Sequence, residues 1–91
     1  MVQARVRFYG KVQGVFFRAN TERKAGEMGI NGYVRNMPDG SVEAVFEGNE
    51  EKVKTIINWC SKNIRAARVT HVDVKYENAE FFNGFEIRYY T

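Results

Sequence analysis

Residues 10–18, with the sequence Gly-Lys-Val-Gln-Gly-Val-Phe-Phe-Arg, combine groups that could bind an anion. Gly10 and Gly14 allow the backbone to turn tightly and to approach a ligand closely. A helical pattern follows the segment, and the first amides of a helix are unpaired and lie at the positive end of its dipole. Arg18 adds a planar guanidinium whose donors suit phosphate or carboxylate. The segment therefore predicts a strand-to-helix loop that binds an anionic group.

Asn36 is a second polar residue that could take part in chemistry, and it ends the segment Gly-Tyr-Val-Arg-Asn at 32–36. A carboxamide has both a donor and an acceptor end and could hold one water molecule. We expect its strand to run beside the first strand of the sheet, which would bring Asn36 to the mouth of the loop. An asparagine before a turn also often bonds its own backbone, so the spacing leaves both interpretations open.

Other kinds of site find little support in the sequence. Gly14 is followed by Val15 rather than by Lys-Ser or Lys-Thr, so the loop is not a Walker A motif. Cys60 is predicted to be a small apolar residue on the buried face of a helix, and His71 has no apparent catalytic partner. One histidine and one cysteine are too few for a zinc site built by the protein. We therefore expect no metal and no cofactor, and a substrate that is already activated.

The elements that position these residues follow from the periodicity of the apolar residues. Alternation over residues 2–8 predicts a half-buried strand. After the loop, a helical pattern starts at Phe17 and ends at Gly29. Two short strands at 32–37 and 41–47 are joined by Pro-Asp-Gly, which is typical of a hairpin turn. The anion-binding loop would then connect the first strand to the first helix.

The second half of the chain continues with a helix and two strands. Asn49 is a good N-cap residue, and Glu50 and Glu51 are placed favourably in the first helical turn. The apolar stripe of this helix consists of Val53, Ile56, Ile57 and Cys60. Strands are expected around residues 72–76 and 85–89. The order β-α-β-β-α-β with a short extra C-terminal strand predicts an α+β, ferredoxin-like sandwich, with two helices on one face of an antiparallel sheet.

The composition is that of an ordinary globular domain. The 91 residues, of which 44% are hydrophobic and 27% charged, suit a single domain over residues 1–91. The net charge of +3 favours anionic ligands but does not by itself indicate nucleic-acid binding. No apolar run approaches the roughly 20 residues that span a bilayer, and the first residues lack the apolar core of a signal peptide. We therefore expect a cytoplasmic protein without membrane contact.

Taken together, the segments at 10–18 and 32–36, followed by Asp-Gly-Ser-Val-Glu-Ala at 39–44, closely resemble the acylphosphatase family. Gly-Phe-Glu-Ile at 84–87 is similar to the C-terminal end of that family, so the resemblance covers essentially the whole chain. It implies a ferredoxin-like fold. It also implies an enzyme that hydrolyses the carboxyl–phosphate bond of acyl phosphates to carboxylate and inorganic phosphate.

The resemblance further implies roles for individual residues. The phosphate-binding arginine of the family matches Arg18, and its water-positioning asparagine matches Asn36. The backbone amides of its phosphate loop match Gln13, Gly14, Val15, Phe16, Phe17 and Arg18. A carboxylate whose conjugate acid has a pKa of about 4 can leave without a strong general acid. The absence of an apparent acid, metal or cofactor would therefore be no obstacle to this reaction.

Two other functions share some of these features. A noncatalytic module that binds phosphate or another anion would use the same loop but would not need Asn36. Aromatic residues and positive charge could suggest an RNA-binding domain, but the segment at 41–47 does not match the basic, aromatic RNP1 pattern. A copper carrier is excluded because the cysteine pair is absent. We expect a small acyl phosphate as the binding partner, no nucleic acid, and a monomer.

Overall fold

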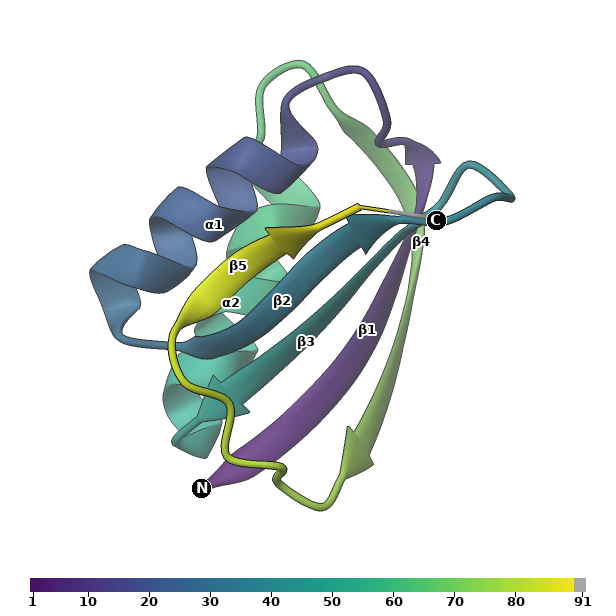
Figure 1. Ribbon diagram of the computed structural model, residues 1–91. Helices are drawn as coiled ribbons and strands as arrows, with labels where there is room; N and C mark the ends of the chain where they lie inside the picture. Colours follow the sequence, from purple (N-terminus) through teal and green to yellow (C-terminus); the bar gives the residue numbers. More distant parts are fainter. Residues whose placement is uncertain (90–91) are drawn as a thin grey trace.

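The strands and helices follow one another along the chain in the order that the apolar pattern predicts (Figure 1). This computed structural model describes residues 1–89. Within these residues, neither helix has the length and apolar character needed to cross a membrane. The elements are β1 (Val2–Lys11), α1 (Phe17–Met28), β2 (Asn31–Asn36), β3 (Val42–Gly48), α2 (Glu50–Lys62), β4 (Arg68–Glu77) and β5 (Phe85–Arg88).

The strands form one sheet in the order β4-β1-β3-β2-β5. β1 pairs with β3 and β4, and β2 pairs with β3, in each case antiparallel, whereas β2 and β5 run parallel. Two expectations are therefore wrong. The sheet is mixed rather than wholly antiparallel, and β2 lies between β3 and β5 rather than beside β1.

Both differences follow from the way the strands are connected. β2 and β3 form a hairpin, so β3 occupies the place next to β2 that we expected β1 to take. The chain leaves β4 at the edge of the sheet where β2 begins, and it starts β5 there, so β5 runs in the direction of β2 (Figure 1). Because β1 and β2 are both antiparallel to β3, their C-terminal ends lie at the same edge. Asn36, the last residue of β2, therefore lies at the same end of the sheet as the start of the loop after β1.

The core lies between the sheet and the two helices, which cover the same face of the sheet (Figure 1). The ring of Phe17, the first residue of α1, lies with its centroid 5.0 Å from that of Phe8 in β1. This contact ties the start of α1 to the strand that precedes the loop. Other core residues are Ala4 and Val6 of β1, Val42, Ala44 and Phe46 of β3, Ala25 of α1, and Val53, Ile56 and Cys60 of α2.

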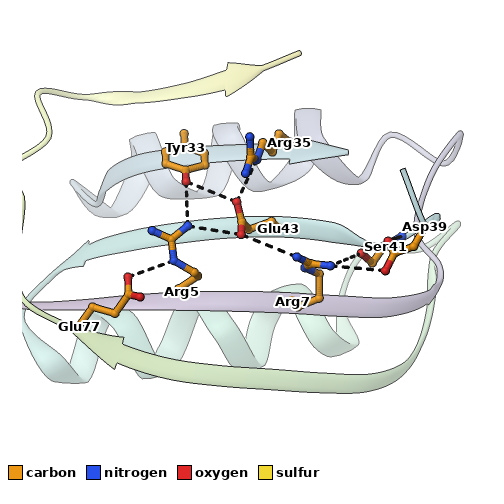
Figure 2. A network of polar contacts seen from close by, with 8 residues as sticks. All are labelled: Arg5, Arg7, Tyr33, Arg35, Asp39, Ser41, Glu43 and Glu77. Atoms are coloured by element: carbon orange, nitrogen blue, oxygen red, sulfur yellow. Dashed lines mark hydrogen bonds and ion pairs between the residues drawn. The ribbon is translucent and has the colours of Figure 1, made fainter. Parts of the chain in front are cut away.

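The opposite face of the sheet carries charged side chains that pair with one another (Figure 2). Glu43 of β3 is almost fully buried, and its carboxylate oxygens lie 3.3 Å from Nη1 of Arg5 and 2.9 Å from Nε of Arg35. A third arginine, Arg7, lies 3.9 Å from the same carboxylate. The hydroxyl of Tyr33 accepts a hydrogen bond from Arg5. The arginines on this face therefore already have a carboxylate partner within the protein.

Candidate active site

Two buried valines anchor the loop between β1 and α1. Val12 and Val15 belong to the core, whereas Gly14 and Phe16 are exposed. Gly14 has a φ of 74° and Phe16 a φ of 62°, so both adopt the left-handed conformation. A chain that enters the left-handed region at intervals can turn successive amides toward one concave side, which is how many loops bind anions. The loop therefore connects β1 to α1, as predicted, and two of its residues are left-handed.

Gly10, by contrast, has a different role from the one expected. Its φ is 120°, and a β-carbon at this position would collide with the carbonyl oxygen of Arg68 in β4. The register between β1 and β4 also shifts here, between Tyr9 and Gly10. Gly10 thus permits the close approach of two strands, and it does not line the pocket that contains Arg18 and Asn36.

The N-terminus of α1 lacks the usual side-chain partners. Its N-cap residue is Phe16, which forms no capping hydrogen bond, and the first turn contains no acidic residue. The first amides of the helix therefore have neither an intrahelical acceptor nor a capping side chain. Arg18 adds a positive charge at the end of the helix where the dipole is already positive. This end of α1 would be stabilised by an anion.

A pocket of about 350 Å³ lies between this helix end, the loop and the ends of β2 and β5. It brings together Arg18 and Asn36, which lie on different elements. Two residues of the predicted phosphate loop, Gln13 and Val15, lie outside its wall. The residues that line it are Val12, Gly14, Phe16, Phe17, Arg18, Ala19, Asn36, Ile87 and Tyr89.

The guanidinium of Arg18 lies over an aromatic ring at the pocket. It is partly buried, and its central carbon lies 5.2 Å from the centroid of the Tyr89 ring. Within residues 1–89 it forms no ion pair, unlike the arginines that share Glu43 on the other face of the sheet (Figure 2). A guanidinium stacked on a ring keeps the donors at its edges free for an oxyanion.

Asn36 presents an unpaired acceptor. It is the last residue of β2, where it pairs with Val42 of β3. Its Oδ1 is buried and has no hydrogen-bond partner within the part of the chain that the structure describes. A buried polar atom left unpaired costs about 1–3 kcal/mol, and such atoms call for an explanation. The oxygen does not bond its own backbone, as the alternative interpretation proposed, and a water molecule or a ligand could satisfy it.

Gln13 connects the loop to the turn that follows Asn36. Its Nε2 donates to the carbonyl oxygens of Met37 and Ser41, each at 2.9 Å. The turn is itself held by Asp39, whose Oδ1 accepts from the Ser41 amide at 2.9 Å. Hydrogen bonds from Ser41 are the main reason why the pKa of Asp39 is lowered. The side chain of Gln13 therefore sets the position of the loop relative to Asn36, a role that the sequence did not suggest.

Sequence reasoning also missed Ile87 and Tyr89 as residues of the pocket. We placed both on the last strand but assigned them no site, because their position depends on which strand β5 joins. The parallel pairing of β5 with β2 sets Ile87 opposite Val34 and brings the end of β5 to the pocket. The alternation of apolar residues at 85–89 was the only signal, and it indicated a strand rather than a site.

The remaining candidates for chemistry lie elsewhere. Burial raises the pKa of the Cys60 thiol to about 12, so it stays protonated at neutral pH and is a core residue, as predicted. His71 is exposed, with Nε2 2.7 Å from a carboxylate oxygen of Asp73. Within residues 1–89, no three His, Cys, Asp or Glu side chains lie close enough to bind a metal ion.

Comparison with known proteins decides the family. A sequence profile described as acylphosphatase matches residues 4–87. The chain belongs to the acylphosphatase family. It is 49% identical over 86 residues to an acylphosphatase of Thermococcus kodakarensis, with 94% of each chain covered. It is 50% identical to an acylphosphatase of Aeropyrum pernix, covering 98% of this chain and 90% of that one.

The crystal structure of the acylphosphatase from Bacillus subtilis shows the same fold. It matches with a TM-score of 0.94 and 31% sequence identity, over 98% of this chain and 100% of that one. The predicted ferredoxin-like fold is therefore confirmed, with the added parallel strand β5. Membership of the acylphosphatase family also identifies the chain as a hydrolase.

Proposed function

We propose that this chain hydrolyses the carboxyl–phosphate bond of acyl phosphates to a carboxylate and inorganic phosphate. One observation carries the proposal. Arg18 and Asn36, which come from different elements, line one pocket together with the uncapped N-terminus of α1. The acylphosphatases to which the chain is similar support the same reaction.

Arg18 and the amides of residues 13–18 bind the phosphate in this proposal. The guanidinium provides coplanar donors to two phosphate oxygens, and the amides at the start of α1 provide further donors at the positive end of the helix dipole. Gln13 and Val15 contribute through their backbone only, because Gln13 uses its side chain for the turn and Val15 is buried in the core. Charge that spreads over the equatorial oxygens in the transition state is thereby stabilised.

Asn36 positions the attacking water. The unpaired Oδ1 accepts a hydrogen bond from the water and holds it in line with the bond that breaks. The water oxygen forms a bond to phosphorus, and the bond from phosphorus to the acyl oxygen breaks. The carboxylate leaves with the electron pair of that bond; one proton of the water passes to a phosphate oxygen, and the other stays on the oxygen that has joined phosphorus. Gln13 holds the loop and the turn at a constant separation during these steps.

The leaving group explains why so few side chains suffice. The conjugate acid of a carboxylate has a pKa of about 4, so the group departs without protonation. The transition state for phosphoryl transfer is loose, and positioning with electrostatic stabilisation supplies most of the catalysis. We therefore propose a reaction that uses neither a metal ion nor a cofactor.

A comparison of two substrates tests this proposal. The purified chain is assayed with acetyl phosphate and with phenyl phosphate, a phosphate monoester whose leaving group has a pKa of about 10, like that of tyrosine. We expect kcat/KM for acetyl phosphate to exceed that for phenyl phosphate by at least about 10³-fold, because no general acid assists the poorer leaving group. Similar values for the two substrates would contradict the leaving-group argument.

A noncatalytic anion-binding module is the alternative that the pocket also permits. It would bind inorganic phosphate but would leave acetyl phosphate intact. The unpaired oxygen of Asn36 favours the enzyme, since phosphate oxygens are acceptors and an amide oxygen beside them needs a donor such as water. Phosphate binding without turnover in the same assay would support the module instead.

We also propose that residues 1–91 act as a single domain, as a monomer, in the cytoplasm. One sheet unites strands from both ends of the chain, and the single cysteine is a free, buried thiol that requires no oxidising compartment. Light scattering coupled to size-exclusion chromatography tests the monomer. A mass of twice 10.5 kDa at assay concentrations would contradict it.

A further inference from the structure

Two exposed aromatic rings flank the phosphate pocket. Phe16 is 78% exposed and Tyr89 is 72% exposed, and both line the pocket beside Arg18. Large apolar side chains this accessible contribute little to the fold. A pocket of about 350 Å³ is also larger than a phosphate group requires, and it falls at the lower end of the range for small-molecule sites.

The backbone of Phe16 adds to this observation. Its φ of 62° is rarely adopted by bulky side chains, and asparagine or glycine would take it at lower cost. Folding therefore does not explain the ring. Phe81 combines the same φ of 62° with 75% exposure, but it lies in the loop before β5 and outside the pocket. The conformation alone is thus no sign of a ligand, and the position of Phe16 at the pocket is what distinguishes it.

Tyr89 lines the pocket in contact with Arg18. Its ring faces the guanidinium at 5.2 Å and leaves the edge of the guanidinium to an oxyanion. A phosphate bound at that edge would lie beside the ring. If the loop and the start of α1 bind the phosphate, the group attached to the phosphate extends away from them, within a pocket that Phe16 and Tyr89 also line.

We propose that Phe16 and Tyr89 form a subsite for the acyl group, and that it favours aromatic or extended apolar acyl groups over acetyl. This inference rests on the proposed hydrolysis of acyl phosphates. An acyl group with a ring would remove apolar area of both side chains from water and could stack on either. An acetyl group has much less apolar area to remove from water. Since the rings are exposed at the surface, the expected preference is modest, about tenfold in kcat/KM.

The test measures the ratio of kcat/KM for benzoyl phosphate to that for acetyl phosphate. Wild type is compared with Phe16→Asn, which suits the left-handed backbone, and with Tyr89→Ala. We expect the ratio to fall about tenfold in the double variant and by smaller factors in each single variant. A ratio cancels any general effect on phosphate binding. Phe81→Asn is the matched control and leaves the ratio unchanged.

A measurement on wild type alone keeps the inference testable if a variant fails to fold. Phenylphosphonate and methylphosphonate carry the same anionic group, and we expect phenylphosphonate to inhibit about tenfold more strongly. Equal inhibition constants, or an unchanged substrate ratio in folded variants, would overturn the acyl subsite while the proposed hydrolysis remained. If wild type hydrolysed neither acyl phosphate, both proposals would fail.

Discussion

The N-termini of the two helices differ in how their first amides are satisfied. α2 begins after Asn49, whose Oδ1 accepts from the amide of Lys52 at 2.8 Å, and Glu50 and Glu51 occupy its first turn. α1 begins after Phe16, which provides no capping oxygen, and its first turn carries Arg18 and no acid. The two ends therefore have opposite local charge, although each follows a strand and packs on the same sheet.

The capped N-terminus of α2 contributes to stability, whereas the uncapped N-terminus of α1 is suited to binding an anion. A capping side chain and first-turn acids stabilise a helix by roughly 1 kcal/mol or more in total, and α2 has both. α1 lacks them at the end that faces the pocket, where a carboxylate would occupy the place of a ligand oxyanion. We infer that the N-terminus of α1 is completed by the phosphate of the substrate and that of α2 by its own side chains.

Removing Arg18 should have the largest effect. Arg18→Ala takes away the charged donor, and an arginine that stabilises a phosphoryl transition state contributes about 10³-fold or more. We expect kcat/KM for acetyl phosphate to fall by about this factor, and inorganic phosphate to stop inhibiting. Arg65→Ala, which removes an exposed arginine outside the pocket, is the control and should retain wild-type rates. Equal losses in both variants would show that net charge alone matters.

Giving α1 a first turn like that of α2 should weaken binding. Ala19→Glu introduces a carboxylate at the pocket wall, where it competes with phosphate for the same amides. We expect the inhibition constant of phosphate to rise about tenfold, while the free energy of unfolding rises by about 0.3–1 kcal/mol through the helix dipole. Ala19→Gln has the same size without charge and should change phosphate inhibition much less. Denaturant titration and inhibition assays measure the two effects separately.

Gln13 links the loop to the turn after Asn36, and its loss should affect both stability and rate. Gln13→Ala removes two hydrogen bonds, to the carbonyl oxygens of Met37 and Ser41. We expect the free energy of unfolding to fall by about 1–2 kcal/mol and kcat to fall more than phosphate affinity, because Asn36 and the loop can then move apart. If phosphate affinity fell instead and kcat held, Gln13 would act on the phosphate directly.

The cap of α2 should contribute to stability alone. Asn49→Ala removes the oxygen that accepts from Lys52, and we expect a loss of about 1 kcal/mol in the free energy of unfolding. Asn49→Asp keeps an acceptor and should lose little. The rate with acetyl phosphate should be unchanged in both, measured well below the unfolding transition. A change in rate would mean that the helix ends are coupled.

Features that depend on neighbouring residues could be predicted from the sequence. The bounds of α1, the cap at Asn49 and the hairpin at 38–40 each follow from local preferences for helix, cap and turn. The partners of β2 and the direction of β5 could not be predicted in this way. Both depend on which distant segments meet, and a short strand such as Phe85–Arg88 carries too little pattern to specify its neighbour.

The same distinction between local and long-range features applies to the candidate site. We predicted that Arg18 and Asn36 would come together, and they do line one pocket, although by way of β3 and not by direct pairing of β1 with β2. The contact of Tyr89 with Arg18 and the two bonds of the Gln13 side chain were missed, because each joins residues far apart in sequence. Local sequence therefore indicated the candidate groups, and long-range pairing determined what surrounds them.

The central claim is that Arg18 binds the phosphate and Asn36 positions the water. The variant Asn36→Ala tests it most directly. Its kcat for acetyl phosphate and its inhibition constant for inorganic phosphate are measured beside those of wild type. If Asn36 orients the water, kcat should fall by about 10²–10³-fold, the cost of losing a positioned polar group in an active site, while the phosphate inhibition constant changes by less than about threefold. A wild-type kcat would contradict the account, and so would a phosphate affinity that fell as far as the rate.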